Sequence, residues 1–519
     1  MSSSVSTTPV QPVGPLLALT GGALTTADVE DVARRSLRVE LAPAGRSRME
    51  QALRSLSAAM SGGNAIYGVN TGFGSFSRTR IPDADLRAVQ HNLIRSHAAG
   101  VGELLPADVV RATMLLLAAS LSRGHSAVRP AVVDTLCALL NAGIIPCVPS
   151  LGSVGASGDL APLAHIALVL IGEGEACVTE HGRQTRCVPG AEALRLAGAV
   201  PLELGPKEGL ALINGTHLMA AQGALLMSDV VRLFDAAVTA AAMSIDSCRA
   251  TNAFLDERVH DVRRQPGPRR VATRLRLLLD GSQIIPSHRE NDPRVQDPYS
   301  LRCAPPVLGA ALDAIEYVRR IIDFELGSVT DNPLVFESGA VISAGNFHGM
   351  PLAVPLDTLA IALSHVAGIS ERRTYYMLAA ADPEAHLRPH LAPTPGLQSG
   401  FMIAQYTAAA CCNEIITLCT PASVSNIPTS AGMEDYNSFG PRSAAKARRA
   451  LDLCTRVVAI ELLCAAEALE YHRPLRSGHG VERAHAIIRQ VVPRLSSDRP
   501  PAPDIEAICS LIRAGRFGN

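Results

Sequence analysis

The chain has 519 residues, of which 47% are hydrophobic and 18% charged, so it can bury a large core and is not intrinsically disordered. Its formal net charge of −1 excludes a global electrostatic attraction to nucleic acid or to an anionic membrane. It has no Trp and only 3% aromatic residues, which argues against base stacking as its function.

The N-terminal segment resembles a loose tail. Its first fifteen residues are polar and contain Pro, and they have neither a charged start nor an apolar run, so we expect no signal peptide. The apolar run near residues 352–369 contains Asp357 and predicts a buried helix rather than a membrane span. We therefore expect a cytoplasmic protein with no membrane and no nucleic-acid partner.

Helical periodicity dominates from about residue 104 onward. Runs over 105–122 and 130–143 have Pro near the start and Gly beyond the end, as helices do. Apolar residues at three- and four-residue spacing predict further helices over 207–250, 306–328, 351–380, 399–420 and 440–470. These helices are apolar on most faces, so other helices or other subunits must cover them.

The predicted fold is mainly α. We expect a small N-terminal domain with mixed loops, residues 1–110, followed by an elongated domain, residues 111–519, that forms a long central helical bundle. Long loops rich in Gly and Pro separate the helical runs, at 61–75, 146–162, 283–302, 327–350, 381–400 and 421–440. Long loops in compact domains are usually functional, so the active site is predicted among them.

The twelve cysteines are scattered and form no CxxC pairs. In a chain of this length they predict reduced, buried thiols rather than a disulfide framework. His165 and His348 stand alone, and no HExxH spacing occurs. The spacing therefore predicts no metal site.

The segment LGSVGASGDLAPLAH, residues 151–165, contains the tripeptide Ala156-Ser157-Gly158. If the amide nitrogen of Gly158 bonds to the carbonyl carbon of Ala156, a five-membered ring closes, and Gly permits the close backbone approach that this needs. Loss of water from the ring and from Ser157 leaves a conjugated methylidene, which is an electrophile. Two alternatives stay open: a plain turn before a helix near Leu160, and a serine hydrolase, although a GxSxG elbow would need its last Gly one residue later.

The segment GSVGASGDLAPLAH resembles the signature of the histidine/phenylalanine/tyrosine ammonia-lyase family around its self-made methylidene-imidazolone (MIO) group. Further blocks resemble that family in the same order: YGVNTGFG at 67–74, KEGLALINGT at 207–216, VQDPYSLRC at 295–303, DNPLVF at 331–336, GNFHG at 345–349, SERR at 370–373 and APDIEA at 502–507. The resemblance covers nearly the whole chain. It implies a mainly helical homotetramer whose active sites are built by loops from three subunits, with MIO formed autocatalytically and no diffusible cofactor.

Elimination of ammonia needs a better leaving group and a base for the β-proton. The resemblance implies that MIO, made from Ala156-Ser157-Gly158, binds the amine and that Tyr67 is the base. A phenol is a weak base at neutral pH, so the surroundings of Tyr67 would have to favour the phenolate. The glycines beside it suggest a mobile lid. Asn214 would donate to the ring carbonyl.

The resemblance also assigns residues of other blocks. Asp159 matches a position used in ring formation, and its alternative role is a helix N-cap. Tyr299 would act in proton transfer or hydrogen bonding at the ring and the amine. Arg302 would bind the substrate carboxylate, with Gln296 in the same block. Phe347 matches a position beside the ring, and Met402 fits enzymes of histidine or tyrosine.

Two positions help to predict the substrate. His97, in Ser-His, and Glu434, in Glu-Asp, match the pattern of the family's histidine enzymes. A carboxylate and an imidazole can pair with the two nitrogens of a histidine substrate, whereas a phenyl ring would leave Glu434 unpaired. We therefore expect a small amino-acid substrate, L-histidine, converted to urocanate and ammonia.

Some features keep alternatives open. The segment Tyr436-Asn437-Ser438-Phe439 departs from the histidine enzymes, and the loop 377–391 lacks their usual ending. A tyrosine or other aromatic amino acid ammonia-lyase, a 2,3-aminomutase and a lyase of a histidine derivative remain alternatives. A catalytically inactive relative is a further one, against which the intact Ala156-Ser157-Gly158 argues.

Overall fold

The computed structural model describes residues 15–63, 65–180 and 183–518, with side chains also omitted at 179–180 and 183–185. The chain separates into two compact units, each composed of several segments. The first comprises Met1–Gln222, Asp323–Gly349 and Ile427–Asn437, and the second comprises Gly223–Ile322, Met350–Asn426 and Ser438–Asn519.

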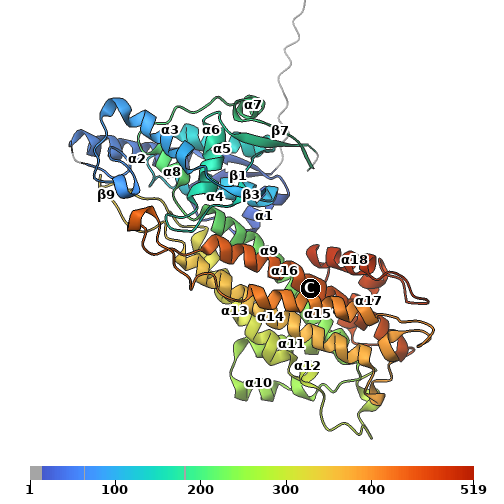
Figure 1. Cartoon of the computed structure of the whole chain (residues 1–519). Coiled ribbons are helices and arrows are strands. Elements are labelled where there is room, and N and C mark those ends of the chain that lie inside the picture. Colours follow the sequence, from blue (N-terminus) through green and yellow to red (C-terminus); the bar gives the residue numbers. More distant parts are fainter. Residues whose placement is uncertain (1–14, 64, 181–182, 519) are drawn as a thin grey trace, which may run out of the picture. The chain divides into compact units, whose positions relative to one another are not determined.

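The first unit combines short helices with small sheets (Figure 1). Its helices are α1 (Thr26–Arg34), α2 (Pro43–Ser61), α3 (Leu86–His97), α4 (Ala107–Ser122), α5 (Pro130–Asn141), α6 (Leu160–Leu170), α7 (Gly190–Leu196), α8 (Glu208–Ile213) and the start of α9 (His217–Ser247). Its strands are β1 (Leu16–Leu19), β2 (Arg38–Leu41), β3 (Val101–Leu104), β4 (Ile144–Pro146), β5 (Pro149–Leu151), β6 (Glu175–Glu180), β7 (Arg183–Pro189), β8 (Leu334–Val335) and β9 (Val341–Ile342). Short 3-10 turns are η1 (Gly74–Phe76), η2 (Asp83–Asp85) and η7 (Ser430–Gly432).

The sheets of this unit have two or three strands. β1 and β2 are parallel, with Leu16 opposite Arg38, whereas β3 pairs with β5 and β8 with β9 in antiparallel fashion. β4, β6 and β7 form an antiparallel sheet in that order. The expected domain boundary at residue 110 falls inside this unit, because α4 packs against α1 and α6 packs against α3.

The second unit is a bundle of long helices (Figure 1). It holds the rest of α9 together with α10 (Glu257–Arg263), α11 (Pro266–Leu279), α12 (Tyr299–Arg302), α13 (Ala304–Glu325, up to Ile322), α14 (Met350–Ala379), α15 (Met402–Leu418), α16 (Gly440–Ala468), α17 (His479–Arg489) and α18 (Ala502–Arg513). Its 3-10 turns are η3 (Ala253–Leu255), η4 (Pro286–His288), η5 (Pro383–Ala385), η6 (Pro389–Leu391) and η8 (Leu469–His472). α16 packs along α14, α15 and α18.

A buried ion pair lies inside this bundle. Arg373 of α14 donates from Nε and Nη2 to the carboxylate of Glu461 in α16, over 2.5 and 2.8 Å, and both side chains are fully buried. Ser244 of α9 donates to the same carboxylate over 2.7 Å. Because a buried charge is costly unless it is paired, these contacts fix the register of three helices. The SERR block therefore has a structural role here.

Among the described residues, one helix, α14, is long and apolar enough to cross a membrane by composition. Two thirds of its most apolar window is buried within the protein. Its Asp357 accepts a hydrogen bond from the backbone of Ser423 over 2.9 Å and forms an ion pair with Lys446 over 3.4 Å. These features are those of a core helix, as the sequence predicts.

The expectation of a mainly helical fold with a long helical bundle is confirmed. One predicted helix differs: the run over 207–250 is broken between α8 and α9, at Asn214-Gly215-Thr216. Gly215 has φ +130°, a conformation that L side chains rarely adopt. The break frees the backbone of Gly215 to pair with the loop at Ser157.

Candidate active site

The loop that carries Ala156-Ser157-Gly158 connects β5 to α6 and is held by the backbone of Gly215. Gly158 and Gly215 form a parallel bridge. The N–H of Gly215 donates to the carbonyl oxygen of Ser157 over 3.2 Å, and the N–H of Asp159 donates to the carbonyl oxygen of Gly215 over 2.8 Å. A Cβ on Gly158 would lie 2.0 Å from that oxygen of Gly215. Only glycine therefore fits at position 158.

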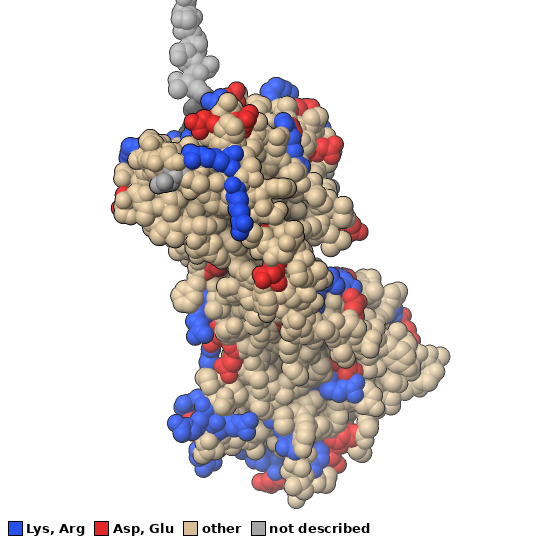
Figure 2. Space-filling model, turned by 60° about the vertical axis from the view of Figure 1, so that its left-hand side comes forward, with Lys and Arg blue, Asp and Glu red and all other residues tan. Residues whose placement is uncertain are grey.

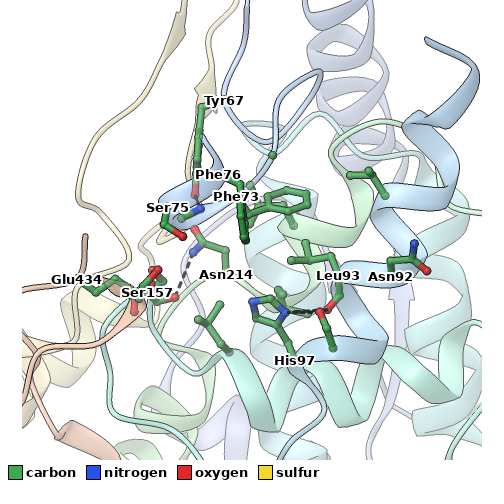
Figure 3. A pocket seen from close by; sticks show the side chains of 18 residues that line it. Tyr67, Phe73, Ser75, Phe76, Asn92, Leu93, His97, Ser157, Asn214 and Glu434 are labelled. Carbon is green, nitrogen blue, oxygen red and sulfur yellow. Dashed lines mark hydrogen bonds between the residues drawn. The ribbon is translucent and has the colours of Figure 1, made fainter. Parts of the chain in front are cut away.

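Asn214 adds a second donor to the same carbonyl group. Its Nδ2 donates to the carbonyl oxygen of Ser157 over 3.1 Å (Figure 3). The side chain of Asn214 is almost fully buried, at 3% exposure, and its Oδ1 has no partner in the described part of the chain. Two N–H groups that converge on one carbonyl oxygen stabilise negative charge there, as an oxyanion hole does.

Asp159 is fully buried behind this loop. Its Oδ2 accepts from the backbone N–H groups of Leu218 and Met219, over 2.9 and 3.1 Å, and its Oδ1 lies 3.1 Å from the hydroxyl of Ser153. The side chain thus caps the N-terminus of α9 and makes no capping bond to its own helix, α6. Burial raises the pKa of Asp159 to about 7, although these hydrogen bonds oppose the shift. Asp159 can therefore exchange a proton near neutral pH.

His217 lies behind Gly215. A Cβ on Gly215 would lie 2.6 Å from Cε1 of this imidazole, which is fully enclosed and whose two nitrogens have no hydrogen-bond partner among the described residues. Burial, together with the positive charge of Arg123, lowers the pKa of His217 to about 3, so the ring is neutral at physiological pH.

Two adjoining cavities, of about 430 and 420 Å³, open beside the loop in the first unit. Both are lined by Tyr67, Gly74, Ser157, Asn214 and Glu434. Figure 3 shows the side chains of Tyr67, Asn214, Ser157 and Glu434 around the first cavity, with Ser157 and Glu434 together at one side. No Lys or Arg is among the described residues that line either cavity.

The hydroxyl of Tyr67 accepts a hydrogen bond from the backbone N–H of Gly74 over 3.2 Å. This hydrogen bond fixes the position of the Tyr67 oxygen at the edge of the cavity. Gly68 has φ +69°, and a Cβ there would lie 2.2 Å from Leu210. Glycine at this position lets the Tyr67 loop pack against α8.

Glu434 lies directly beside the tripeptide. Its Oε1 accepts from the hydroxyl of Ser157 over 3.2 Å, and its Oε2 accepts from the hydroxyl of Thr429 over 2.7 Å. Because Thr429 and Glu434 also pair through their backbones across η7, the carboxylate is fixed in position. It can therefore hold a positive group next to Ser157.

His97, at the end of α3, lines the first cavity and is part-buried. Its Nδ1 lies 2.8 Å from the carbonyl oxygen of Leu93 (Figure 3). A carbonyl oxygen can only accept, so Nδ1 carries the proton and Nε2 is left as an acceptor. Burial lowers the pKa of His97, even though the hydrogen bond to Leu93 and the charge of Glu434 oppose it, which keeps the ring neutral.

The second cavity brings two more of the predicted residues to the loop. Ala156 and Phe347 line it with Ser157. The N–H of Gly349, two residues after Phe347, donates to the carbonyl oxygen of Gly155 over 3.3 Å. The GNFHG segment is therefore tied to the tripeptide loop.

The other predicted residues lie in the second unit. Arg302 and Tyr299 belong to α12, Gln296 precedes it, and Met402 begins α15. The guanidinium of Arg302 stacks on the ring of Tyr299 at 4.5 Å and donates from Nε to the carbonyl oxygen of Asp297 over 2.8 Å. Tyr299 is 70% exposed. This arginine–tyrosine pair is thus preformed and open to solvent within its unit.

Three residues that surround the loop were not predicted from the sequence: Ser153, Gly215 and His217. Gly215 and Ser153 lie inside the matching blocks, and Gly and Ser are typical of positions where a backbone approaches closely. His217 has no signal in the sequence, since a single His after Thr216 is consistent with any helix start.

Known proteins resemble the chain over almost its entire length. The model of the family described as aromatic amino acid lyase matches residues 24–490. A histidine ammonia-lyase of Anaeromyxobacter sp. (strain K) is 48% identical over 504 residues, which is 96% of this chain and 99% of that protein. The crystal structure of histidine ammonia-lyase from Trypanosoma cruzi has a TM-score of 0.88 at 37% identity, covering 97% of this chain and 94% of that one. Tyrosine aminomutase from Streptomyces globisporus has a TM-score of 0.90 at 33% identity, covering 97% and 98%.

Proposed function

The chain belongs to the aromatic amino acid lyase family, and we propose that it eliminates ammonia from L-histidine to give urocanate. Relatives named histidine ammonia-lyase that match almost its whole length support this substrate. One observation carries the mechanism: the carbonyl oxygen of Ser157 receives N–H donors from both Asn214 and Gly215, at 3.1 and 3.2 Å.

The residues around the tripeptide fit a methylidene-imidazolone group formed from Ala156, Ser157 and Gly158. Position 158 accepts no Cβ, and the carbonyl group of Ser157, which would become a ring carbonyl, already has its donors. When formed, this group supplies an electrophilic carbon that bonds to the substrate amine and makes it a better leaving group. Asp159, with its pKa of about 7, is placed to take part in the proton transfers of ring closure.

The side chains of the cavity have separate tasks. We assign the removal of the β-proton to Tyr67, whose oxygen accepts from Gly74 and which lines both cavities with Ser157. The contact between Ser157 and Glu434 favours a place for this carboxylate at the substrate amine, whereas the sequence pattern alone suggests the imidazole. There it would orient the amine toward the carbon derived from Ser157.

His97 is the group we assign to the substrate side chain. Its Nε2 is an acceptor, so it can bind the N–H of a neutral imidazole. A phenol can donate to the same nitrogen, but a phenyl ring cannot. The second candidate is therefore a tyrosine ammonia-lyase or aminomutase, because the phenol hydroxyl can donate to Nε2 of His97.

The substrate carboxylate needs a cation that the described lining of the cavities lacks. We assign it to Arg302 of another subunit of a homotetramer, with Tyr299 and Gln296 beside it and Met402 near the substrate side chain. Exposed apolar residues on α14 and α15, including Val354, Ile361, Ile403, Tyr406 and Ile416, suit burial between subunits. The face drawn in Figure 2 also has wide areas without charged side chains.

The twelve cysteines are all free thiols, which fits the proposed cytoplasmic location.

Two measurements test the proposal together. Purified protein should release urocanate and ammonia from L-histidine faster than it converts L-tyrosine or L-phenylalanine. Its intact mass should be lower than that of the sequence by two water molecules, whereas Ser157→Ala should lose one water at most and be inactive. A wild-type chain of full mass that is still active would exclude the electrophilic ring. A β-amino acid product would indicate an aminomutase.

A further inference from the structure

Three cysteines far apart in the sequence meet on the sheet formed by β4, β6 and β7. Cys177 of β6 is directly opposite Cys187 of β7. Cys147 follows β4, and its N–H donates to the carbonyl oxygen of Glu175 over 2.9 Å, so it continues the pairing with β6. Glu175, the partner of Cys147, is two residues before Cys177 on β6, and side chains two residues apart on a strand lie on the same face. Cys147, Cys177 and Cys187 therefore share one face of this sheet.

The thiols are close enough to bind a single atom. The Sγ of Cys147 lies 3.4 Å from that of Cys177 and 3.9 Å from that of Cys187, and the last two are 2.7 Å apart. Cys177 is buried, Cys147 is part-buried and Cys187 is exposed, so the trio opens to solvent on one side. Among the described residues, these three cysteines form the cluster of potential metal ligands whose ligand atoms all lie within 4.8 Å of one another.

We propose that Cys147, Cys177 and Cys187 bind one thiophilic metal ion, such as Zn²⁺. A donor set of three sulfurs favours soft or borderline ions over Mg²⁺ or Ca²⁺, which prefer oxygen. Zinc–sulfur bonds of about 2.3 Å in tetrahedral geometry place sulfurs about 3.8 Å apart, near two of the three separations here. The exposed side at Cys187 leaves the fourth position to water.

Binding involves no oxidation or reduction. Three S–H bonds break, three metal–sulfur bonds form, and three protons pass to the solvent buffer. A disulfide between Cys177 and Cys187 would need an external oxidant and would leave Cys147 unused.

The ion would connect three strands near the active-site loop. β4 leads through Cys147 and β5 into the loop that begins at Gly152. The same ion would join the β6–β7 hairpin to β4. The site is independent of the proposed reaction, since its residues line neither cavity at Ser157.

The test compares metal content in the full-length protein. Wild type is stripped with a chelator under reducing conditions, loaded with Zn²⁺, desalted and analysed by elemental mass spectrometry. We expect about one Zn²⁺ per chain in wild type and in Cys412→Ser, a control thiol in α15, and at least about tenfold less in the triple Ser variant of the three cysteines. X-ray absorption at the zinc edge should report three sulfur ligands.

A single variant, Cys187→Ser, keeps the test valid if the triple variant does not fold, because this side chain is exposed. Equal zinc in wild type and the Ser variants, or a zinc spectrum without sulfur, would overturn the proposal. So would a Cys177–Cys187 disulfide that persists in millimolar glutathione. Higher melting temperature with Zn²⁺ in wild type, absent from Cys187→Ser, would support it.

Discussion

The amide of Asn214 and the backbone N–H of Gly215 both point at the carbonyl oxygen of Ser157, over 3.1 and 3.2 Å. Both donors come from the break between α8 and α9, so the distance between them is fixed by the backbone. In a methylidene-imidazolone group this oxygen would belong to the ring carbonyl, which would be conjugated with the electrophilic carbon that the group supplies, so negative charge would develop on the oxygen in the proposed reaction. Donors that are already in place stabilise this charge without reorganisation.

Asn214→Ala should therefore lower kcat by about 10²–10³-fold, the usual loss when one such donor is removed. Intact mass separates a catalytic effect from a failure to form the ring, since a chain that is two waters lighter has the ring. Asn92→Ala, on α3 in the same cavity, is the control and should change kcat by no more than about twofold. Normal kcat in Asn214→Ala would remove this residue from the mechanism.

Much of the helical fold could be predicted from the sequence, because long runs with apolar residues at three- and four-residue spacing can bury those residues together only as helices. α4, α5 and α13–α16 lie within a few residues of their predicted ranges. The break at Asn214-Gly215-Thr216 was not predicted, because it is stabilised by hydrogen bonds to the loop at Ser157, which lies more than fifty residues earlier in the chain. Tertiary contacts of this kind override helix propensity.

The candidate site was predicted through its motif blocks, and the structure brings Tyr67, His97, Ser157, Asn214 and Glu434 to one cavity. Local spacing could not reveal the cluster of Cys147, Cys177 and Cys187. Its members meet only because β6 and β7 are paired in a particular register, and register depends on the folded sheet.

His97 and Glu434 should differ in their effects on specificity. If Glu434 holds the amine, Glu434→Gln should reduce turnover of L-histidine and of any slower substrate by similar factors, about tenfold or more for one charge-assisted hydrogen bond. His97→Leu removes the acceptor for the side chain, so it should reduce histidine turnover selectively and shift preference toward phenyl rings. The ratio of kcat/KM for L-histidine and L-phenylalanine measures both effects. A loss confined to histidine in Glu434→Gln would instead place this carboxylate at the imidazole.

The pH dependence of stability should reveal two buried groups with opposite signs. The pKa of Asp159 is raised from 3.8 to about 7, so its contribution to stability is complete below pH 3.8 and is lost as pH rises through 7. The pKa of His217 is lowered from 6.5 to about 3, so its contribution is complete above pH 6.5 and is lost as pH falls toward 3. Each group can change the free energy of unfolding by at most about 1.4 kcal/mol per pH unit in its window.

Relative to wild type, Asp159→Asn should therefore make the loss of stability on acidification steeper, and His217→Gln should make it shallower. Denaturant unfolding of each protein between pH 4 and 7 provides the comparison, with slopes rather than absolute values compared because both substitutions also change packing. Parallel curves for wild type and His217→Gln would mean that this imidazole is solvated in the folded protein.

The division of the active site between subunits can be tested by co-expression. Ser157→Ala removes the electrophile and Arg302→Ala removes the proposed carboxylate ligand, so each variant alone should be almost inactive. If Arg302 acts on the Ser157 of another chain, some sites in a mixed tetramer take an intact Ser157 from one variant and an intact Arg302 from the other. Random assembly of equal amounts makes about a quarter of the sites complete. Two different affinity tags allow the mixed tetramers to be isolated before the assay.

The control pairs Ser157→Ala with Asn214→Ala, since these two residues are hydrogen-bonded within one chain and no mixed site regains both. Activity near a quarter of wild type in the first pair, with none in the control, is the expected outcome. Equal inactivity of both pairs would mean that each chain supplies its own Arg302 to its own Ser157.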